Sequence, residues 1–307
     1  MTLTVGSCFA GIGGIDLGLE AAGGFQTVWH SEIKPAANRV MAHRFPSSEP
    51  LGDITALTHG LFTPPHVDVI AGGPPCQGIS KGNAFGRRGL EDPRSALFHT
   101  YAELVALVEP SWVVMEQVSG LLTSGDDYAT VLHTFAEIGY EIAVAVVNSL
   151  AYVPQTRERL LIVGSRDAEA SRRALLPLRK DGARDPYEDR PSRRRAPVRH
   201  GDGAYLFRKS RRAQSALDGE TWVETDYANT LTLNDVGQAR ATVIVLDETG
   251  RPRVLTPEEW EACHGFPSGW TIAAGSDGDR WAALGNTITP QIAQRVGQGI
   301  RSVEETK

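Results

Sequence analysis

The stretch "LTVGSCFAGIGGIDLGLEAAG", Leu3–Gly23, decides the fold class, because it joins a β-rich run (3–9) to a helical run (14–23) through a glycine-rich turn. The same succession continues to about residue 165. Further β-rich runs lie at 26–32, 67–73, 112–118, 141–148 and 160–165, and helical stretches lie at 35–44, about 95–107 and about 128–138. Strands that alternate with helices predict an α/β fold with a mostly parallel sheet covered by helices on both faces.

Polar or conformationally special residues follow the ends of these strands. They are the glycines at 11–14, Glu32, Asp53, Cys76 and Glu116. Open parallel sheets bind ligands outside the carboxyl ends of their strands. We therefore expect all five positions to face one crevice.

The first of these positions, "FAGIGG", indicates close approach of the backbone to a ligand, although such glycines also serve simple tight turns. A dinucleotide-binding protein would have G-x-G-x-x-G, but Asp16 stands three residues after Gly13. Glu32, 21 residues after Gly11, suits a ribose hydroxyl, and Asp53 suits an adenine amino group. Both carboxylates are also compatible with solvated strand ends. Together the pattern favours an adenosine-containing cofactor without a pyrophosphate.

A cysteine stands on the stiff turn "GGPPCQGIS", residues 72–80. Lone cysteines are commonly buried in apolar runs, but Cys76 follows two prolines at the end of a strand. This placement favours a nucleophile. Glu116 ends the apolar run "WVVME", where a carboxylate suits a proton donor or a hydrogen-bond partner of a ring nitrogen, or else an exposed strand end.

Two arginine-containing segments are compatible with anion binding. In "QTRER", Gln155, Arg157 and Arg159 share one face if the segment is extended, which suits an anion site or an edge-strand ion pair. The segment 172–212 holds 14 Lys and Arg and five Asp and Glu, in a chain of net charge −6. Such an island suggests a polyanion bound at one place, or an arginine-rich solvated loop.

Composition limits the class of protein. Of 307 residues, 41% are hydrophobic and 22% charged, with no apolar run of the roughly 20 residues that span a membrane. Three well-separated cysteines argue against a disulfide framework or a metal cluster. Without the pattern of a secretory signal at the start, we expect a soluble, cytoplasmic protein.

The regular alternation stops near residue 178. From there to about 254 the chain is rich in Pro, Gly and Arg with short strand-like pieces, which indicates a small, irregular β-rich domain. Thr256, Pro257 and Glu259 then predict a capped helix, and an amphipathic helix follows near the end. The interpretation is a catalytic domain at 1–177, a second domain at 178–269 and a segment at 270–307 that returns to the first.

Taken in order, these stretches resemble the cytosine-carbon-5 DNA methyltransferase family. "FAGIGG", Glu32, "GDI", "GGPPCQGIS", "EQV", "QTRER", "RVLTPEEWEACHGFP" and "GNTI" occur in the family's order and nearly at its spacing, over almost the entire chain. The resemblance implies a seven-stranded Rossmann-like domain that binds S-adenosylmethionine, a small target-recognition domain, and a cleft between them for double-stranded DNA.

The resemblance also implies roles for individual residues. The cofactor pocket would be lined by Phe9, Gly11, Gly13, Glu32, Asp53, Ile54, Leu97 and Asn286. Cys76 would be the nucleophile, with Glu116, Arg157 and Arg159 binding the target base. DNA contacts would come from Gln77, Ser80, Arg87, Arg88 and Thr230. No metal is implied.

Two departures from the family pattern carry an expectation. Gln117 replaces the usual asparagine that braces the proline-cysteine loop, and its extra methylene is expected to shift that loop and reduce activity. Ala262 and Cys263 replace a commoner arginine-leucine pair, which affects only local packing.

The expected reaction is transfer of a methyl group to carbon 5 of a flipped-out cytosine, through a covalent Cys76 adduct, by a monomeric enzyme. Two other functions stay open: methylation of transfer RNA, and a catalytically silent DNA-binding module. "CQGIS" lacks the "CQPFT"-like ending of the transfer RNA branch, and the intact Cys76 and Glu116 argue against silence. The amino-acid sequence leaves two points open: a pairing with a restriction endonuclease, and the DNA sequence that is recognised.

Overall fold

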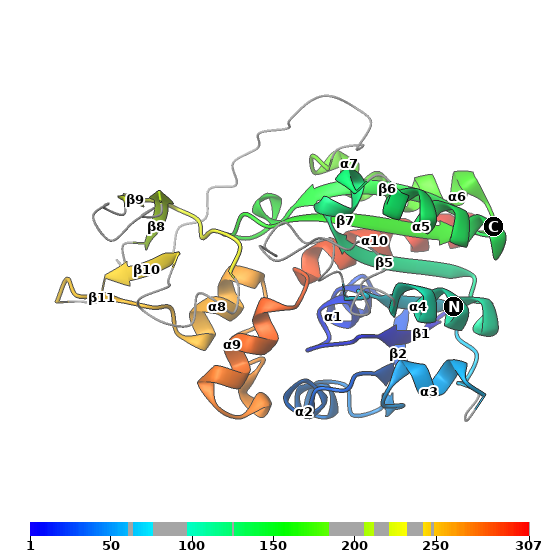
Figure 1. Cartoon of the computed structure of the whole chain (residues 1–307), viewed down its shortest axis with the longest axis horizontal. Coiled ribbons are helices and arrows are strands. Elements are labelled where there is room, and N and C mark those ends of the chain that lie inside the picture. Colours follow the sequence, from blue (N-terminus) through cyan, green and yellow to red (C-terminus); the bar gives the residue numbers. More distant parts are fainter. Residues whose placement is uncertain are drawn as a thin grey trace.

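Seven strands form the central sheet of the structure, a computed structural model that describes residues 1–60, 64–75, 97–124, 126–183, 206–211, 221–231, 242–246 and 249–306 (Figure 1). The strands are β1 (Leu3–Cys8), β2 (Phe25–Ser31), β3 (Glu49–Pro50), β4 (Val69–Gly72), β5 (Trp112–Val118), β6 (Glu141–Asn148) and β7 (Glu158–Ser165). Their spatial order is β3-β2-β1-β4-β5-β7-β6. The first five are parallel, whereas β7 is inserted antiparallel between β5 and β6.

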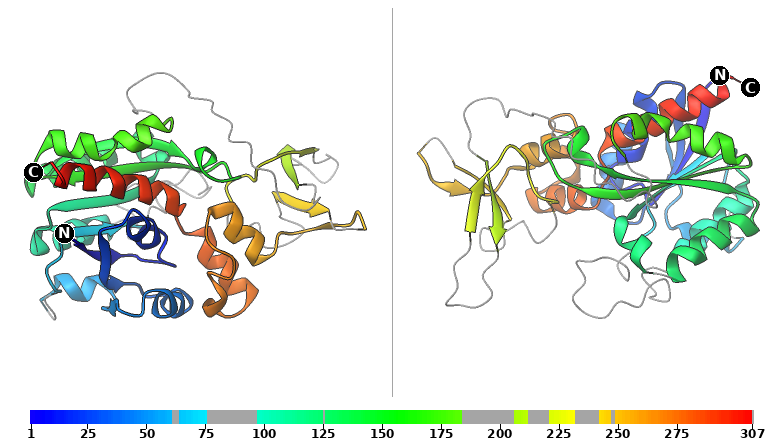
Figure 2. Two further views of the ribbon diagram at one scale, coloured as in Figure 1. Left: turned by 180° about the vertical axis from the view of Figure 1, so that it is seen from behind. Right: turned by 90° about the horizontal axis from the view of Figure 1, so that it is seen from above.

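Helices cover both faces of this sheet, as the sequence predicts (Figure 2). One face packs against α1 (Gly14–Ala21), α6 (Ala168–Ala174), α7 (Leu176–Lys180) and α10 (Pro290–Glu304), and the other against α3 (Ile54–Thr58), α4 (Leu97–Val108) and α5 (Asp126–Glu137). Successive strand residues alternate between these two cores, so that Val114 faces the first and Val113 the second. This double burial explains why β5 reads as a continuous apolar run.

A separate four-stranded antiparallel sheet lies at one end of the molecule (Figure 1). It consists of β8 (Leu206–Arg211), β9 (Thr221–Glu224), β10 (Val243–Leu246) and β11 (Pro252–Arg253). Helices α8 (Pro257–His264) and α9 (Asp277–Gly285) follow it and pack near α2 (Pro35–Arg44) in a third apolar core. The expected boundary at 177/178 falls inside α7, and the division into domains stays a prediction.

The N-terminus of α8 has the capping expected from the sequence. The Thr256 hydroxyl accepts from the backbone N–H of Glu259, and the Glu259 carboxylate accepts from the backbone N–H of Thr256. Pro257 occupies the first turn of the helix. Backbone N–H groups have no acceptor within the helix there, so the N–H that proline lacks costs no hydrogen bond. Gly265 ends the helix with φ 82°, a left-handed conformation that glycine adopts without a steric penalty.

The last helix returns the chain to the first helix. Helix α10 packs along α1 so closely that a Cβ on Gly18 would lie 2.2 Å from the carbonyl oxygen of Pro290. The contact fixes the start of α10, and with it the preceding residues 286–289, against the beginning of α1. In the part of the chain that the structure describes, no helix is both long and apolar enough to cross a bilayer.

A buried carboxyl group lies beneath the first turn of α1. Asp16 is fully buried and accepts hydrogen bonds from Ser7 Oγ (2.9 Å) and Thr27 Oγ1 (3.1 Å). Burial raises the pKa of Asp16 to about 6, against the opposing effect of these two hydrogen bonds. The carboxyl group is therefore protonated more readily in the folded than in the unfolded chain.

Substituting Asp16→Asn should change how stability depends on pH. Because the folded pKa is raised, the stabilising contribution of Asp16 is full below the unfolded pKa and is lost as pH rises through about 6. Between pH 7 and pH 5 the wild type should therefore gain about 1 kcal/mol in free energy of unfolding relative to the variant. Urea titrations of both proteins at pH 7 and pH 5 measure the free energies of unfolding. The same difference between wild type and variant at both pH values would contradict the raised pKa of Asp16.

Candidate active site

The glycine-rich turn between β1 and α1 has an unusual backbone conformation and close neighbours on one side. Three of its residues have positive φ: Phe9 (52°), Gly11 (57°) and Gly13 (75°). A Cβ on Gly13 would lie 2.4 Å from the ring of Phe45, so a larger residue cannot occupy this position. A Cβ on Gly11 would meet only the Phe9 carbonyl oxygen, at 3.9 Å. The turn is therefore closed on the side of Gly13 and open beside Gly11.

Glu32 ties this turn to the end of the neighbouring strand. One carboxylate oxygen accepts from the backbone N–H of Gly11 (2.8 Å), and the other accepts from the N–H groups of Ile33 (2.9 Å) and Lys34 (2.8 Å). Glu32 is 9% exposed, whereas the Ile33 side chain that follows it is 68% exposed. An acidic group and an open apolar side chain thus lie together at the carboxyl end of β2. Ile33 is absent from our sequence-based set, because a single apolar residue beside a motif gives no signal.

Asp53 and Ile54 lie at the next position along this edge. The Ser31 hydroxyl donates to the Gly52 carbonyl oxygen (2.7 Å), which holds the segment beside the end of β2. Asp53 is exposed and caps α3 by accepting from the backbone N–H of Thr55 (3.0 Å), while Ile54 is buried. The structure therefore brings Glu32 and Asp53 to adjacent strand ends.

Asn286 and Leu97, the two other residues expected in the cofactor pocket, come from distant parts of the sequence. Asn286 is exposed at the end of α9 and donates to the Ala282 carbonyl oxygen (2.9 Å). The segment that follows it lies against the start of α1, where a Cβ on Gly14 would be 2.4 Å from Thr287 Oγ1. Leu97, half-buried, begins α4 and packs at the edge of the core on the opposite face.

Glu116 and Arg159 form an ion pair between neighbouring strands β5 and β7. Arg159 Nε lies 2.5 Å from Glu116 Oε1, and the side chains are 12% (Arg159) and 19% (Glu116) exposed. A Cβ on Gly73, just after β4, would lie 3.0 Å from the other carboxylate oxygen. Glycine at this position therefore leaves room for the carboxylate beside the turn that leads to Cys76. The sequence placed Glu116 at a strand end and Arg159 in the segment "QTRER", and the antiparallel insertion of β7 brings them together.

Gln117 braces the proline turn. Its side-chain Nε2 donates to the Pro74 carbonyl oxygen at 2.8 Å, and its side chain is buried. The longer side chain thus reaches the turn directly from β5. Whether this contact shifts the turn relative to the family pattern stays a prediction, because Cys76 itself lies outside the described residues.

Gln117→Leu roughly keeps the volume of the side chain but removes the amide N–H that donates to the Pro74 carbonyl oxygen. We expect turnover to fall about tenfold, which is the effect of losing one buried hydrogen bond that positions the turn. Cofactor affinity should not change. Gln294→Leu on α10 serves as the control, because it removes a hydrogen bond from a glutamine side chain to the Ala21 carbonyl oxygen. Equal turnover of the two variants, measured with saturating DNA, would show that the brace does not matter.

The three regularly spaced residues of "QTRER" have separate partners. Arg157 is buried, and its guanidinium donates to the Gly285 carbonyl oxygen (3.3 Å). Gln155 lies 3.5 Å, Nε2 to Nε2, from His264. Burial lowers the pKa of His264 to about 3, with further lowering by Arg157 and Arg159, so its ring is neutral. Arg159 pairs with Glu116.

Residues 228–230, which follow β9, contact the same segment. Thr156 donates its backbone N–H to the Ala228 carbonyl oxygen (2.9 Å), and Ala228 donates to Pro154 (2.8 Å). The hydroxyl of Thr230 donates to the Thr156 carbonyl oxygen (2.7 Å). Thr230, expected to contact DNA, thus lies against Thr156, which stands three residues before Arg159.

The remaining predicted residues, Cys76, Gln77, Ser80, Arg87 and Arg88, lie outside the described residues. Both other cysteines are buried and free. Burial raises the pKa of the Cys263 thiol to about 12 and raises that of Cys8 further above its usual range. Neither thiol is poised to ionise. Within the described ranges, no group of His, Cys, Asp and Glu side chains is arranged to hold a metal ion.

Comparisons with known proteins agree on one family. The model of the C-5 cytosine-specific DNA methylase family matches residues 3–188. The type II methyltransferase M1.HphI of Haemophilus parahaemolyticus is 36% identical over 175 residues, which cover 54% of this chain and 47% of that protein. The type II methyltransferase M.HpaII of Haemophilus parainfluenzae is 29% identical over 318 residues, covering 95% of this chain and 87% of that protein.

A solved structure shares the fold. It is described as a DNA modification methyltransferase encoded within a prophage of E. coli, and it superposes with a TM-score of 0.61 at 19% identity over 99% of this chain and 100% of that one. This likeness confirms the Rossmann-like methyltransferase sheet. Because the family model matches more than half of the sequence, the chain belongs to the C-5 cytosine-specific DNA methylase family.

Proposed function

We propose that this DNA cytosine-5-methyltransferase takes the methyl group from S-adenosylmethionine and methylates a cytosine flipped out of a short, specific sequence in double-stranded DNA, with Cys76 as its nucleophile. The observation that carries the proposal is the Glu116–Arg159 ion pair beside Gly73, on the turn that leads to Cys76. The glycine-rich turn follows β1, two strands from β5, and Glu32 follows β2, three strands from β5, at the same edge of the sheet. The proposed base-binding group and the proposed cofactor-binding turn thus belong to the same edge of the sheet.

The residues at the ends of β1, β2 and β3 fit an adenosine-containing cofactor. The carboxylate oxygen of Glu32 that accepts from Gly11 retains one lone pair that suits a ribose hydroxyl, and Ile33 offers an apolar surface for an adenine ring. The space above Gly11 admits close approach of the backbone to a ligand. Phe9, Gly13, Asp53, Ile54, Leu97 and Asn286 complete the proposed pocket. S-adenosylmethionine supplies an electrophilic methyl group on a sulfonium.

The protein's own groups would make carbon 5 of cytosine nucleophilic. The Cys76 thiolate adds to carbon 6, and the ring then behaves as an enamine whose carbon 5 accepts the methyl group. Glu116 hydrogen-bonds at ring nitrogen 3 and stabilises the charge that develops there. Loss of the carbon-5 proton returns its electron pair to the 5,6 bond, and the carbon–sulfur bond breaks to release Cys76.

Reaction on a duplex requires that the base leave the stack, at a cost of a few kcal/mol. Arg87 and Arg88, together with Gln77, Ser80 and Thr230, are the proposed DNA contacts. On the four-stranded sheet, Lys209 lies over the ring of Trp222 at 5.0 Å and Arg208 over Tyr227 at 5.4 Å. Cations and aromatic rings of this kind suit a phosphate backbone with neighbouring bases.

We further propose a monomeric cytoplasmic enzyme. The relatives include type II methyltransferases and an orphan methyltransferase of a Bacillus phage, so a restriction endonuclease of the same sequence is one proposed functional partner. The paired Glu116 and Arg159 favour an active enzyme over a silent DNA-binding module.

Transfer of a labelled methyl group tests the proposal. Purified protein, S-adenosylmethionine with a tritiated methyl group, and either duplex DNA or transfer RNA are incubated, and the nucleosides are separated. Label in 5-methyl-2′-deoxycytidine from the duplex supports the proposal. Label in transfer RNA alone would support the RNA alternative, and folded protein that binds S-adenosylmethionine and labels neither would support the silent module.

A further inference from the structure

Trp270 connects the segment after α8 to the glycine-rich turn across 258 residues of sequence. Its indole Nε1 donates to the carbonyl oxygen of Ile12 at 2.8 Å, and its ring is 7% exposed. The rings of Phe45 (6.1 Å between centroids) and Phe266 (5.6 Å) pack against it. Phe45 is also the side chain that limits the space at Gly13. The indole thus holds the turn that is proposed to bind the cofactor.

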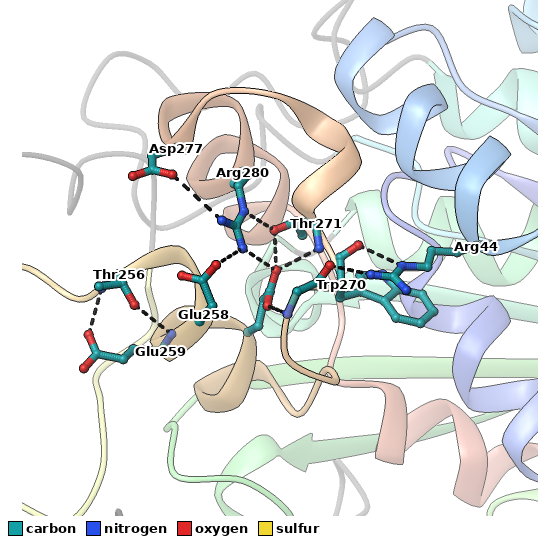
Figure 3. Close-up of polar contacts among 10 residues, drawn as sticks. Arg44, Thr256, Glu258, Glu259, Trp270, Thr271, Asp277 and Arg280 are labelled. Carbon is teal, nitrogen blue, oxygen red and sulfur yellow. Dashed lines mark hydrogen bonds and ion pairs between the residues drawn. The ribbon is translucent and has the colours of Figure 1, made fainter.

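A buried carboxylate fixes the backbone on both sides of Trp270 (Figure 3). Glu261, which is fully buried, accepts from the backbone N–H of Gly269 (2.6 Å) and from that of Thr271 (2.8 Å). Arg280 donates to the same carboxylate (3.1 Å) and pairs with Glu258 (2.6 Å). Its charge compensates the buried carboxylate. Trp270 therefore sits on a backbone fixed at its two adjacent residues.

Arg44 of helix α2 binds the backbone carbonyl groups of the same segment. Arg44 Nε donates to the Trp270 carbonyl oxygen (3.0 Å), and the guanidinium also donates to the carbonyl oxygen of Gly269. The guanidinium carbon lies 4.8 Å from the centre of the indole ring, in a cation–π arrangement (Figure 3). The orientation of the indole is thus set from two directions, by Glu261 and by Arg44.

The glycine-rich turn needs such an external support. Positive φ at Phe9, a residue other than glycine, persists only where surrounding contacts determine it. Glu32 holds the Gly11 end through a backbone N–H, and Trp270 holds the Ile12 end through a carbonyl oxygen. If either support is lost, the turn populates its binding-competent shape for a smaller fraction of the time, and ligand affinity falls by that fraction.

We propose that Trp270 is a positioning residue for S-adenosylmethionine, which preorganises the glycine-rich turn without touching the cofactor. The inference rests on the proposed function of this turn. It predicts a specific division of effects: cofactor affinity depends on the indole N–H, whereas turnover at saturating cofactor does not. A merely structural role would instead change stability or both kinetic constants together.

Trp270→Phe removes the donor and keeps an aromatic ring. We expect the Kd of S-adenosylhomocysteine, measured by titration calorimetry on the full chain, to rise roughly three- to tenfold, as for one lost hydrogen bond. The KM of S-adenosylmethionine should rise in parallel, and kcat should stay within about twofold. Trp281→Phe is the matched control, since Trp281 Nε1 has no hydrogen-bond partner among the described residues, and its Kd should stay at the wild-type value.

The outcomes separate this inference from the proposed function. Wild-type protein that binds no S-adenosylhomocysteine would overturn both. Wild-type binding with an equal Kd in Trp270→Phe would overturn the inference alone, as would a fall in kcat at unchanged Kd. If Trp270→Phe unfolds too readily to titrate, Arg44→Met, which removes the donors to the carbonyl oxygens of Gly269 and Trp270, should raise the Kd in the same direction; an unchanged Kd would overturn the inference.

Discussion

Replacing Cys76 by alanine should abolish methyl transfer to DNA, with turnover below detection, while the affinity for S-adenosylhomocysteine stays at the wild-type value. Without the thiolate, carbon 5 of cytosine remains too weak a nucleophile to accept the methyl group. Methyl transfer from tritiated S-adenosylmethionine and calorimetric binding on the same preparation measure both quantities.

Cys263→Ala is the matched control for this experiment. It removes a thiol that burial keeps protonated, so turnover should survive. DNA containing 5-fluorocytosine gives a second readout. Release of Cys76 requires the carbon-5 substituent to leave without its bonding electrons, which hydrogen does as a proton and fluorine cannot, so the adduct persists. Wild-type protein and Cys263→Ala should form a complex stable to denaturation, and Cys76→Ala should not. Methyl transfer by Cys76→Ala would overturn the covalent mechanism.

Glu116→Gln is expected to lower kcat by about 10²- to 10⁴-fold, the range for a group that stabilises or transfers a proton in the transition state. Glutamine keeps the size of the side chain but loses the charge that pairs with Arg159 at 2.5 Å. Binding of S-adenosylhomocysteine should change little, since Glu116 lies at the proposed base site. Single-turnover methylation of duplex DNA measures the chemical step.

The same substitution at an exposed site provides the control. Glu169 pairs with Arg172 on α6, and Glu169→Gln should leave the rate unchanged. A double-mutant cycle of Glu116→Gln with Arg159→Met then tests whether the pair acts as a unit, in which case the two losses are far from additive. A Glu116→Gln enzyme with nearly wild-type kcat would remove Glu116 from the chemistry.

The layered fold was predictable because it depends on local patterns. Alternating strands and helices indicated a sheet covered on both faces, and Thr256 with Glu259 indicated the start of α8. The short strand β3 has only two residues, too few for any periodicity. The antiparallel direction of β7 also left no trace, because an apolar strand reads alike in either direction. Direction is decided by the connection and by packing.

The site was predictable at its strand ends and not in its long-range contacts. The carboxyl-end rule placed Glu32, Asp53 and Glu116 at one edge of the sheet. The bond from Trp270 to Ile12 joins residues far apart in sequence, and one hydrogen bond of this kind has no sequence signature. Likewise, the reach of Gln117 to the Pro74 carbonyl oxygen depends on the distance between β5 and the turn.

The central claim is that this chain methylates carbon 5 of cytosine through Cys76, and bisulfite sequencing tests it most directly. Plasmid DNA is prepared from a methylation-deficient host that expresses either the wild type or Cys76→Ala at matched soluble levels. We predict protected cytosines within one short sequence motif with the wild type and none with the variant. Unprotected DNA from cells that contain folded, cofactor-binding wild-type protein, or equal protection with Cys76→Ala, would contradict the account.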